Sequence, residues 1–174
     1  MSVLLVRDEL WVPRGHVLVR VFGPDDRLKL EQVNKNLITQ VGDQYLMERA
    51  VGIASPPGQV TGARLGTGTT APAKTGAGAA IVTYKSGTSE AIDATYPQSS
   101  LSGSSRRITW RITWEAGEGT DTALAEIVLT NESPLTDVAG SVSNTISRAL
   151  ISPTVNKGAN DTLEITWSWD GLGA

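Results

Sequence analysis

The sequence predicts a mainly β protein, an antiparallel β-sandwich of jelly-roll-like type with one short helix and an extended N-terminal segment. Three observations lead to this fold class. Apolar and polar residues alternate with a period of two in several segments of the second half of the chain. Turn clusters rich in Gly, Asn and Ser separate these segments roughly every 10–20 residues. A single segment spaces its apolar residues as a helix does.

The first regular element that we expect is a charged hairpin over residues 16–33. Residues 16–22 are rich in β-branched side chains, and residues 27–31 alternate so that Leu28 and Leu30 share one face. Between them, residues 23–26 read Gly-Pro-Asp-Asp, a composition that favours a turn.

Residues 36–50 are the helix candidate. Five apolar side chains recur at helical spacing and form one stripe: Leu37, Ile38, Val41, Tyr45 and Leu46. Asn36 is the expected N-cap, and Gly52 is the expected stop. The stripe predicts a short helix that covers an edge or an end of the sheet.

The segment 52–80 is predicted to be largely loop, because it is poor in large side chains and holds three prolines and seven glycines. We expect one strand within it, near residues 60–66, and a weak strand just after it, over residues 80–85. A connection of this length is unusual inside a compact domain, so we expect it to lie along the surface or to contact a neighbouring chain.

The second half of the chain predicts four strands, over residues 106–115, 122–130, 143–151 and 162–169. Turns or loops separate them at residues 117–119, 131–140 and 156–160. Four of the five tryptophans lie on the first and last of these strands, alternating with polar residues and sharing a face with Ile and Leu: Trp110, Trp114, Trp167 and Trp169. This pattern predicts a buried core. A stacking platform for sugars or bases is the alternative reading of the same four rings.

Length and composition narrow the function classes. The chain has 174 residues, the length of one domain, which we divide into an N-terminal arm over 1–15 and a single β-sandwich domain over 16–174. The net charge of −3 disfavours a nucleic-acid partner. The lack of cysteine excludes disulfides, thiolate metal sites and a Cys nucleophile. We find no signal peptide and no apolar run of about 20 residues, so we expect synthesis in a cytoplasm and no membrane partner.

We predict no catalytic, cofactor-binding or metal-binding residues. His16 is the single imidazole, and the pair Lys74-Thr75 lacks the glycine and the helix of a phosphate-binding loop. Four carboxylates gather near one turn, and we expect them to be solvated: Glu115, Glu118, Asp121 and Glu126. A glycosidase-like pair among such carboxylates is the alternative.

Six segments, in order, carry a resemblance to a known class of proteins. They are Asn-Leu-Ile-Thr-Gln-Val-Gly at 36–42, Arg-Leu-Gly-Thr-Gly-Thr-Thr-Ala-Pro at 64–72, Ile-Thr-Trp-Arg-Ile-Thr-Trp at 108–114, Leu-Ala-Glu-Ile-Val-Leu-Thr-Asn at 124–131, Thr-Ile-Ser-Arg-Ala-Leu at 145–150 and Asp-Thr-Leu-Glu-Ile-Thr-Trp at 161–167. Over residues 30–172 the chain thus resembles small structural proteins of tailed-bacteriophage virions. Val128 departs from the pattern, which usually has Gly at that position.

The resemblance implies a non-enzymatic capsid decoration (cement) protein that binds the outside of the phage head. It implies the major capsid protein and further copies of the chain, as a homotrimer, as partners, and the virion as the location. A neck, tail or fibre component and a carbohydrate-binding receptor-recognition module are the alternatives. The arm carries five apolar residues that we expect at the interface with the capsid or with another subunit, or else in a first strand of the core: Leu4, Leu5, Val6, Leu10 and Trp11.

Overall fold

Nine antiparallel strands make up one curled sheet in the computed structural model, which describes residues 14–171. The elements are β1 (Arg14–Phe22), β2 (Leu28–Ile38), α1 (Gln40–Ala50), β3 (Gly62–Gly66), β4 (Glu90–Ala91), β5 (Gln98–Ser102), β6 (Ser105–Trp114), β7 (Asp121–Thr130), β8 (Thr145–Lys157) and β9 (Thr162–Gly171), with short 3-10 turns at Ala77–Ala79 and Val142–Asn144. Across the sheet the strands follow the order β4-β3-β7-β8-β2-β1-β9-β6-β5. The mainly β prediction is confirmed.

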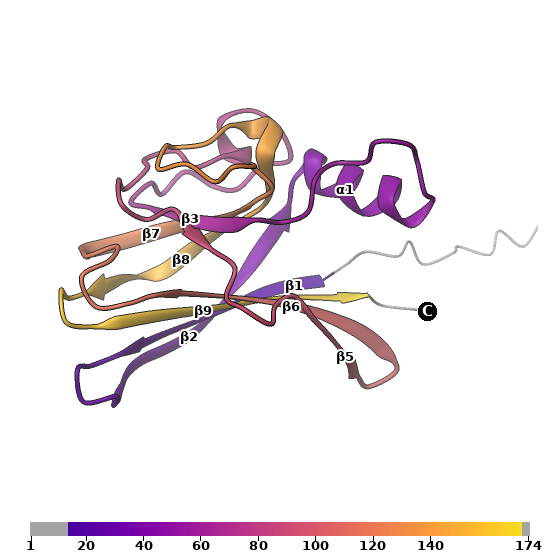
Figure 1. Ribbon diagram of the computed structural model, residues 1–174. Helices are drawn as coiled ribbons and strands as arrows, with labels where there is room; N and C mark the ends of the chain where they lie inside the picture. Colours follow the sequence, from indigo (N-terminus) through magenta and orange to yellow (C-terminus); the bar gives the residue numbers. More distant parts are fainter. Residues whose placement is uncertain (1–13, 172–174) are drawn as a thin grey trace, which may run out of the picture.

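Strand β2 joins the two halves of the sheet, one formed by β3, β4, β7 and β8 and the other by β1, β5, β6 and β9. Its residues as far as Lys35 pair with β1, and its last three residues pair with β8. The sheet curls about this strand, so that β3, β7 and β8 lie across from β1, β6 and β9 (Figure 1). The finer prediction, a jelly-roll-like sandwich, stays a prediction.

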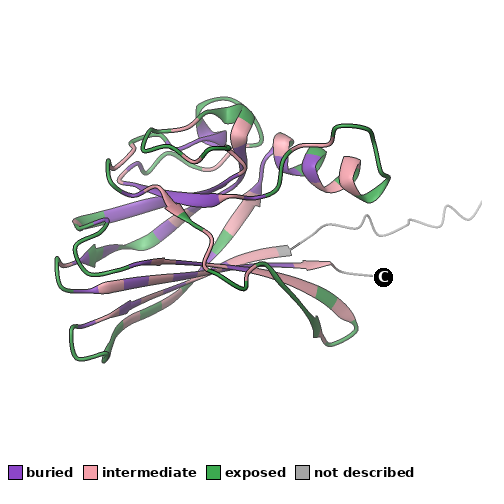
Figure 2. Cartoon of the chain, viewed as in Figure 1, coloured by how far each residue is buried: buried purple, intermediate pink, exposed green. Residues whose placement is uncertain are grey.

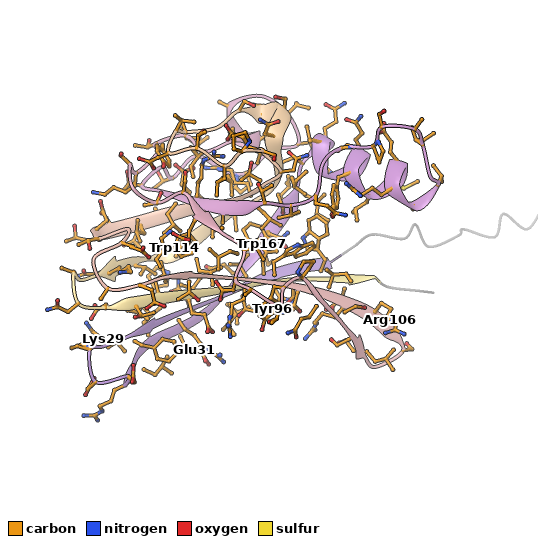
Figure 3. All side chains as sticks on the ribbon, in the orientation of Figure 1. Lys29, Glu31, Tyr96, Arg106, Trp114 and Trp167 are labelled. Carbon is orange, nitrogen blue, oxygen red and sulfur yellow. The ribbon has the colours of Figure 1, made fainter. Side chains whose placement is uncertain are left out.

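The core lies between these two facing halves. Trp110 pairs with Trp167 in the register of β6 and β9, and the rings of Trp110 and Trp169 meet edge to face with centroids 5.0 Å apart. All four tryptophans of the alternating pattern are at most 4% exposed. Trp114 and Trp167 are labelled in Figure 3 between the two halves. The core prediction for these rings is confirmed, and they offer no surface on which a sugar or a base could stack.

The helix starts later than the sequence predicts. Thr39, not Asn36, is the N-cap, and its side-chain oxygen accepts a hydrogen bond from the amide of Gly42 at 3.0 Å. Asn36 instead belongs to β2, where its amide group donates to Ser147 Oγ at 2.7 Å. Pairing with β8 holds residues 36–38 in an extended conformation, which overrides their helical spacing. The stop is as predicted, because Gly52 follows the helix with a φ of +69°.

Gly42 allows α1 to lie against β8. A Cβ atom at this position would come within 2.1 Å of the carbonyl oxygen of Ile146 and 2.6 Å of the Cγ2 atom of Ile38. We therefore expect Gly42→Ala to lower the free energy of unfolding by about 1–3 kcal/mol, as overpacking does. Urea unfolding measures this, with the exposed helix residue Gln44→Ala as control. A Gly42→Ala variant as stable as that control would contradict the close packing of α1.

The strand predictions need correction at residues 80–85 and at strands β4 and β5. Residues 80–85 do not form a strand. A single β-bridge pairs Tyr84 with Gly66, and the amides of Val82 and Thr83 donate to the buried carboxylate of Glu126. Conversely, β4 and β5 were not predicted. Strand β5 reads Gln-Ser-Ser-Leu-Ser, which has neither β-branched residues nor alternation. It is extended because it pairs with β6 over its full length.

Candidate functional site

The outer face of β3, β7 and β8 holds buried charges. Arg64 pairs with Val128, which pairs with Arg148, so these side chains line the face opposite to the core. Glu126 lies on the same face, and both it and Arg148 are 0% exposed. The loops at 67–89 and 131–144 cover this face, as the hydrogen bonds described next show. These strands are therefore buried on both sides.

Glu126 is the anchor of the first loop. Its carboxylate accepts hydrogen bonds from the guanidinium of Arg148 at 2.7 Å and from the amides of Gly68 at 3.0 Å and Thr83 at 2.7 Å. The amide of Val82 also donates to it, at 3.0 Å. The prediction that Glu126 is solvated is wrong, because the loop folds back over β7 and encloses it. Its position between Ala125 and Ile127 places it on the face opposite to the core, and only the fold of the loop buries that face.

Arg64 anchors both loops. Its Nε donates to Ser89 Oγ at 3.0 Å, its Nη2 donates to the carbonyl of Thr136 at 3.0 Å, and its guanidinium forms an ion pair with Glu132. A buried guanidinium can satisfy several acceptors at fixed angles, which makes it suited to holding irregular backbone. The result is a loop surface fixed from beneath by two ion pairs: Glu126–Arg148, which is fully buried, and Arg64–Glu132, in which Arg64 is buried and Glu132 is partly exposed.

A buried lysine, Lys157, fixes two turns: the one that follows β6 and the one that precedes β9. Lys157 Nζ donates to the carbonyls of Glu115 at 2.8 Å and Asp161 at 2.6 Å. Burial lowers the pKa of Lys157, and the nearby Asp161 carboxylate opposes this shift. That carboxylate accepts from Lys29 Nζ at 2.7 Å and from the amide of Gly158. The ammonium of Lys157 thus links the two turns through their backbone carbonyls.

Two aspartates give stability that acid should remove. A hydrogen bond from Lys29 lowers the pKa of Asp161, and hydrogen bonds from Arg107 lower the pKa of Asp170. A pKa lowered in the folded state adds stability that is complete above the unfolded value of about 3.9 and is lost as the pH falls through the folded value. We expect the free energy of unfolding to decrease once the pH is lower than about 4. Asp161→Asn should be less stable than the parent at about pH 6 and should lose less on acidification, as urea unfolding at several pH values would show. An unchanged pH slope in Asp161→Asn would contradict this assignment.

The outer face of β2, β1, β9 and β6, here called the open face, is turned away from α1 and from β3, β7 and β8 (Figure 1). Ion pairs between neighbouring strands run across it, with 2.8 Å between Arg20 and Glu31 and 2.7 Å between Arg107 and Asp170. Val33 interrupts the charges and is 65% exposed. This face carries both signs of charge, which suits a partner of complementary charge.

The side chains of Tyr84, Tyr96 and Lys74 also contact neighbouring side chains. The Tyr84 hydroxyl joins Ser89 and Asp137, and the Arg111 guanidinium lies 5.0 Å from the centre of the Tyr96 ring. Lys74 forms an ion pair with Asp43 on α1 instead of belonging to a phosphate-binding loop.

Two of the carboxylates near the turn have partners close by in the structure. Glu118 accepts from the amide of Glu115 at 2.8 Å, and Asp121 pairs with Lys85. His16 lies on β1, where its strand neighbours are Lys35 and Ser168. The five apolar arm residues expected at an interface lie outside the described residues: Leu4, Leu5, Val6, Leu10 and Trp11.

Within residues 14–171, no cluster of three or more His, Cys, Asp or Glu side chains is placed to hold a metal ion. None of the helical segments in that range has the length and apolar character needed to cross a membrane. One open hollow of about 620 Å³ lies between α1 and the loops, lined mainly by neutral polar residues such as Gln44, Asn131 and Asn144.

Comparisons of the chain with protein-family models, with curated proteins and with solved structures found no match. The open face and the loop surface fixed by Arg64, Glu126 and Arg148 are therefore the features of this structure from which a function can be inferred.

Proposed function

We propose that this chain is a non-enzymatic structural protein of a tailed-bacteriophage virion, a capsid decoration protein that binds the outside of the head and stabilises the shell. In this proposal the two facing halves of the sheet act as the layers of a jelly-roll-like sandwich. The partners are the major capsid protein and further copies of the chain, in a homotrimer.

One observation carries the proposal: segments of the resemblance that are far apart in sequence meet in one buried cluster. The segment at 64–72 supplies Gly68, the segment at 124–131 supplies Glu126, and the segment at 145–150 supplies Arg148, and these three are hydrogen-bonded together. A Cβ atom at Gly68 would come within 2.4 Å of the Glu126 carboxylate. These three residues thus fix the loop surface. A structural protein that binds its partner through a preformed surface requires such fixed loops.

The surface chemistry supports binding to a large partner. The loops are tied down by Arg64, Glu126 and Arg148, which are at most 1% exposed. A partner would thus meet a surface whose shape is set in advance, which lowers the entropic cost of binding. The open face alternates positive and negative side chains, which gives register to a contact and makes it sensitive to salt. A neck or tail component would use the same features, so the location within the particle must be measured.

Rebinding to bare heads tests the proposal. Heads from a phage that lacks this gene are mixed with the purified chain, and bound protein is measured after sedimentation. We expect saturable binding, with shells that withstand more heat than bare heads. Reversing the charge of one ion-pair partner on the open face, by Arg107→Glu, should weaken binding, whereas Met47→Glu at an exposed site on α1, outside both the open face and the loops, should not. Heads that bind no protein would contradict decoration and favour the neck, tail or fibre alternative.

A further inference from the structure

The hollow of about 620 Å³ beside α1 is built from three separate parts of the chain. The helix supplies Val41 and Gln44, the segment after it supplies residues 57–58, and the connection between β7 and β8 supplies residues within 131–136 and 143–144. These residues are half-buried or exposed, whereas the whole of β3 is buried (Figure 2). The volume lies within the range of about 300–1,000 Å³ that is usual for small-molecule sites.

Hydrogen bonds from outside the hollow hold its walls in place. Arg49 Nη2 donates to the carbonyl of Pro57 at 2.6 Å, which fixes the segment after the helix. Thr61 Oγ1 donates to the carbonyl of Glu132 at 2.7 Å, which fixes the start of the connection between β7 and β8. The hollow is therefore formed before any ligand binds, as small-molecule sites usually are.

The charge of the lining favours a neutral ligand. Glu132 is the one charged residue among the described residues that line the hollow, and its side chain is 20% exposed. It is already paired with the buried guanidinium of Arg64, so the ion pair as a whole is neutral. A ligand with a net charge would lose part of its hydration here without finding an unpaired opposite charge.

The other polar groups of the lining favour a ligand with many hydroxyl groups. They are the amides of Gln44, Asn131 and Asn144 and the hydroxyls of Ser133, Thr136 and Ser143. Amides and hydroxyls can each donate and accept hydrogen bonds, and so can the hydroxyl groups of a sugar. An apolar ligand would instead leave these groups without partners, which costs free energy.

Two other classes of neutral polar ligand fit less well. A nucleobase is usually held by stacking on an aromatic ring or a guanidinium, and none of the described lining residues offers either. An extended peptide pairs with a free strand edge, whereas the lining comes from a helix and from loops. Val41, Pro57 and Pro134 offer apolar surface to the C–H groups of a sugar ring.

We propose that this hollow binds a neutral saccharide, whose hydroxyl groups pair with the side-chain amides of Gln44 on the helix wall and Asn144 on the loop wall. Gln44 Nε2 donates to Glu48 at 2.8 Å, which leaves its oxygen as an acceptor. The backbone of Asn144 is held by Ser141 and Asn131, at 3.2 Å and 3.1 Å. Binding at one site is expected to be weak, in the millimolar range, because no aromatic ring stacks on the sugar.

The saccharide site is independent of the proposed virion role. If the chain does decorate a shell, many copies of a weak site would bind a polysaccharide with much higher avidity than one copy does. The site itself needs no capsid, so it is tested on the purified chain. Its failure would leave the decoration proposal as it stands, and the reverse also holds.

NMR titration of the isotope-labelled full chain is the test, with maltose, lactose and N,N′-diacetylchitobiose as probes. We expect at least one of these disaccharides to shift the signals of residues that line the hollow, in a saturable manner, while the signals of the open face stay unchanged. Among monosaccharides, glucose should bind more tightly than glucuronate or protonated glucosamine, because the lining has no unpaired charge to offer.

A matched pair of variants locates the site. Asn144→Ala should lower the affinity about five- to tenfold, the effect of one lost hydrogen bond. Asn156→Ala, the same change at an exposed position near the other end of β8, should leave it unchanged. If Asn144→Ala fails to fold, Gln44→Ala on the exposed side of α1 gives the same comparison. No shifts with any of the three disaccharides, shifts confined to other surfaces, tighter binding of a charged sugar, or equal affinity of the parent and the hollow variant would overturn the proposal.

Discussion

Replacing Glu126 by Gln is expected to lower the free energy of unfolding by about 3–5 kcal/mol, because it leaves the charge of Arg148 buried without its partner. The substitution keeps the size of the side chain, so the loss reports charge and hydrogen bonding. It also places an amide group where the backbone amides of Gly68 and Thr83 require an acceptor. Guanidinium unfolding of both proteins measures the difference.

An exposed ion pair provides the matched control. Lys74 and Asp43 are both about half exposed, so Asp43→Asn should cost less than about 1 kcal/mol. The double variant Glu126→Leu with Arg148→Met should recover part of the loss, because it removes the unpaired charge and leaves only neutral groups unsatisfied, namely the backbone amides and the carbonyl of Gly78. If Glu126→Gln proved as mild as Asp43→Asn, the loops would not be anchored by the buried carboxylate.

Trp114→Ala should be the most damaging change in the core, lowering the free energy of unfolding by about 3–5 kcal/mol. The ring is 0% exposed, and its Nε1 donates to the carbonyl of Thr88 at 3.0 Å. The residue therefore links the core to the loop that also contacts Arg64 through Ser89.

Replacement by Phe separates packing from hydrogen bonding. Trp167 is equally buried, but its Nε1 has no hydrogen-bond partner among the described residues. Trp114→Phe should thus cost about 1 kcal/mol more than Trp167→Phe, the value of a buried hydrogen bond. Unfolding curves of the two variants give the comparison, and a larger loss for Trp167→Phe would contradict the anchoring role of Trp114.

The sequence alone was enough to predict a strand and its core-facing side where one face of the strand is buried and the other is not. Strand β6 alternates Ile and Trp with Thr and Arg, so its position and its core face could both be predicted. Strand β5 could not, because it is extended through pairing with β6 and has no pattern of its own. Asn36 shows the same limit, since a tertiary strand pairing replaced the local helical preference.

The buried charges were missed for a related reason. A Glu or Arg in an apolar strand is normally placed on the solvent side, and only the path of a distant loop turns that side into an interior. Nothing local to Glu126 indicates that residues 68–83 fold over it. The apolar residues predicted at an interface lie before residue 14, outside the described residues, and their role stays a prediction.

The copy number of this chain in purified virions tests the central proposal most directly. Quantitative mass spectrometry would compare it with the major capsid protein, and cryo-imaging would locate it. Decoration predicts copies on the whole outer surface of the head, in a fixed ratio to the capsid subunits. A few copies confined to one vertex or to the tail would contradict decoration, and complete absence from the particle would contradict a virion role altogether.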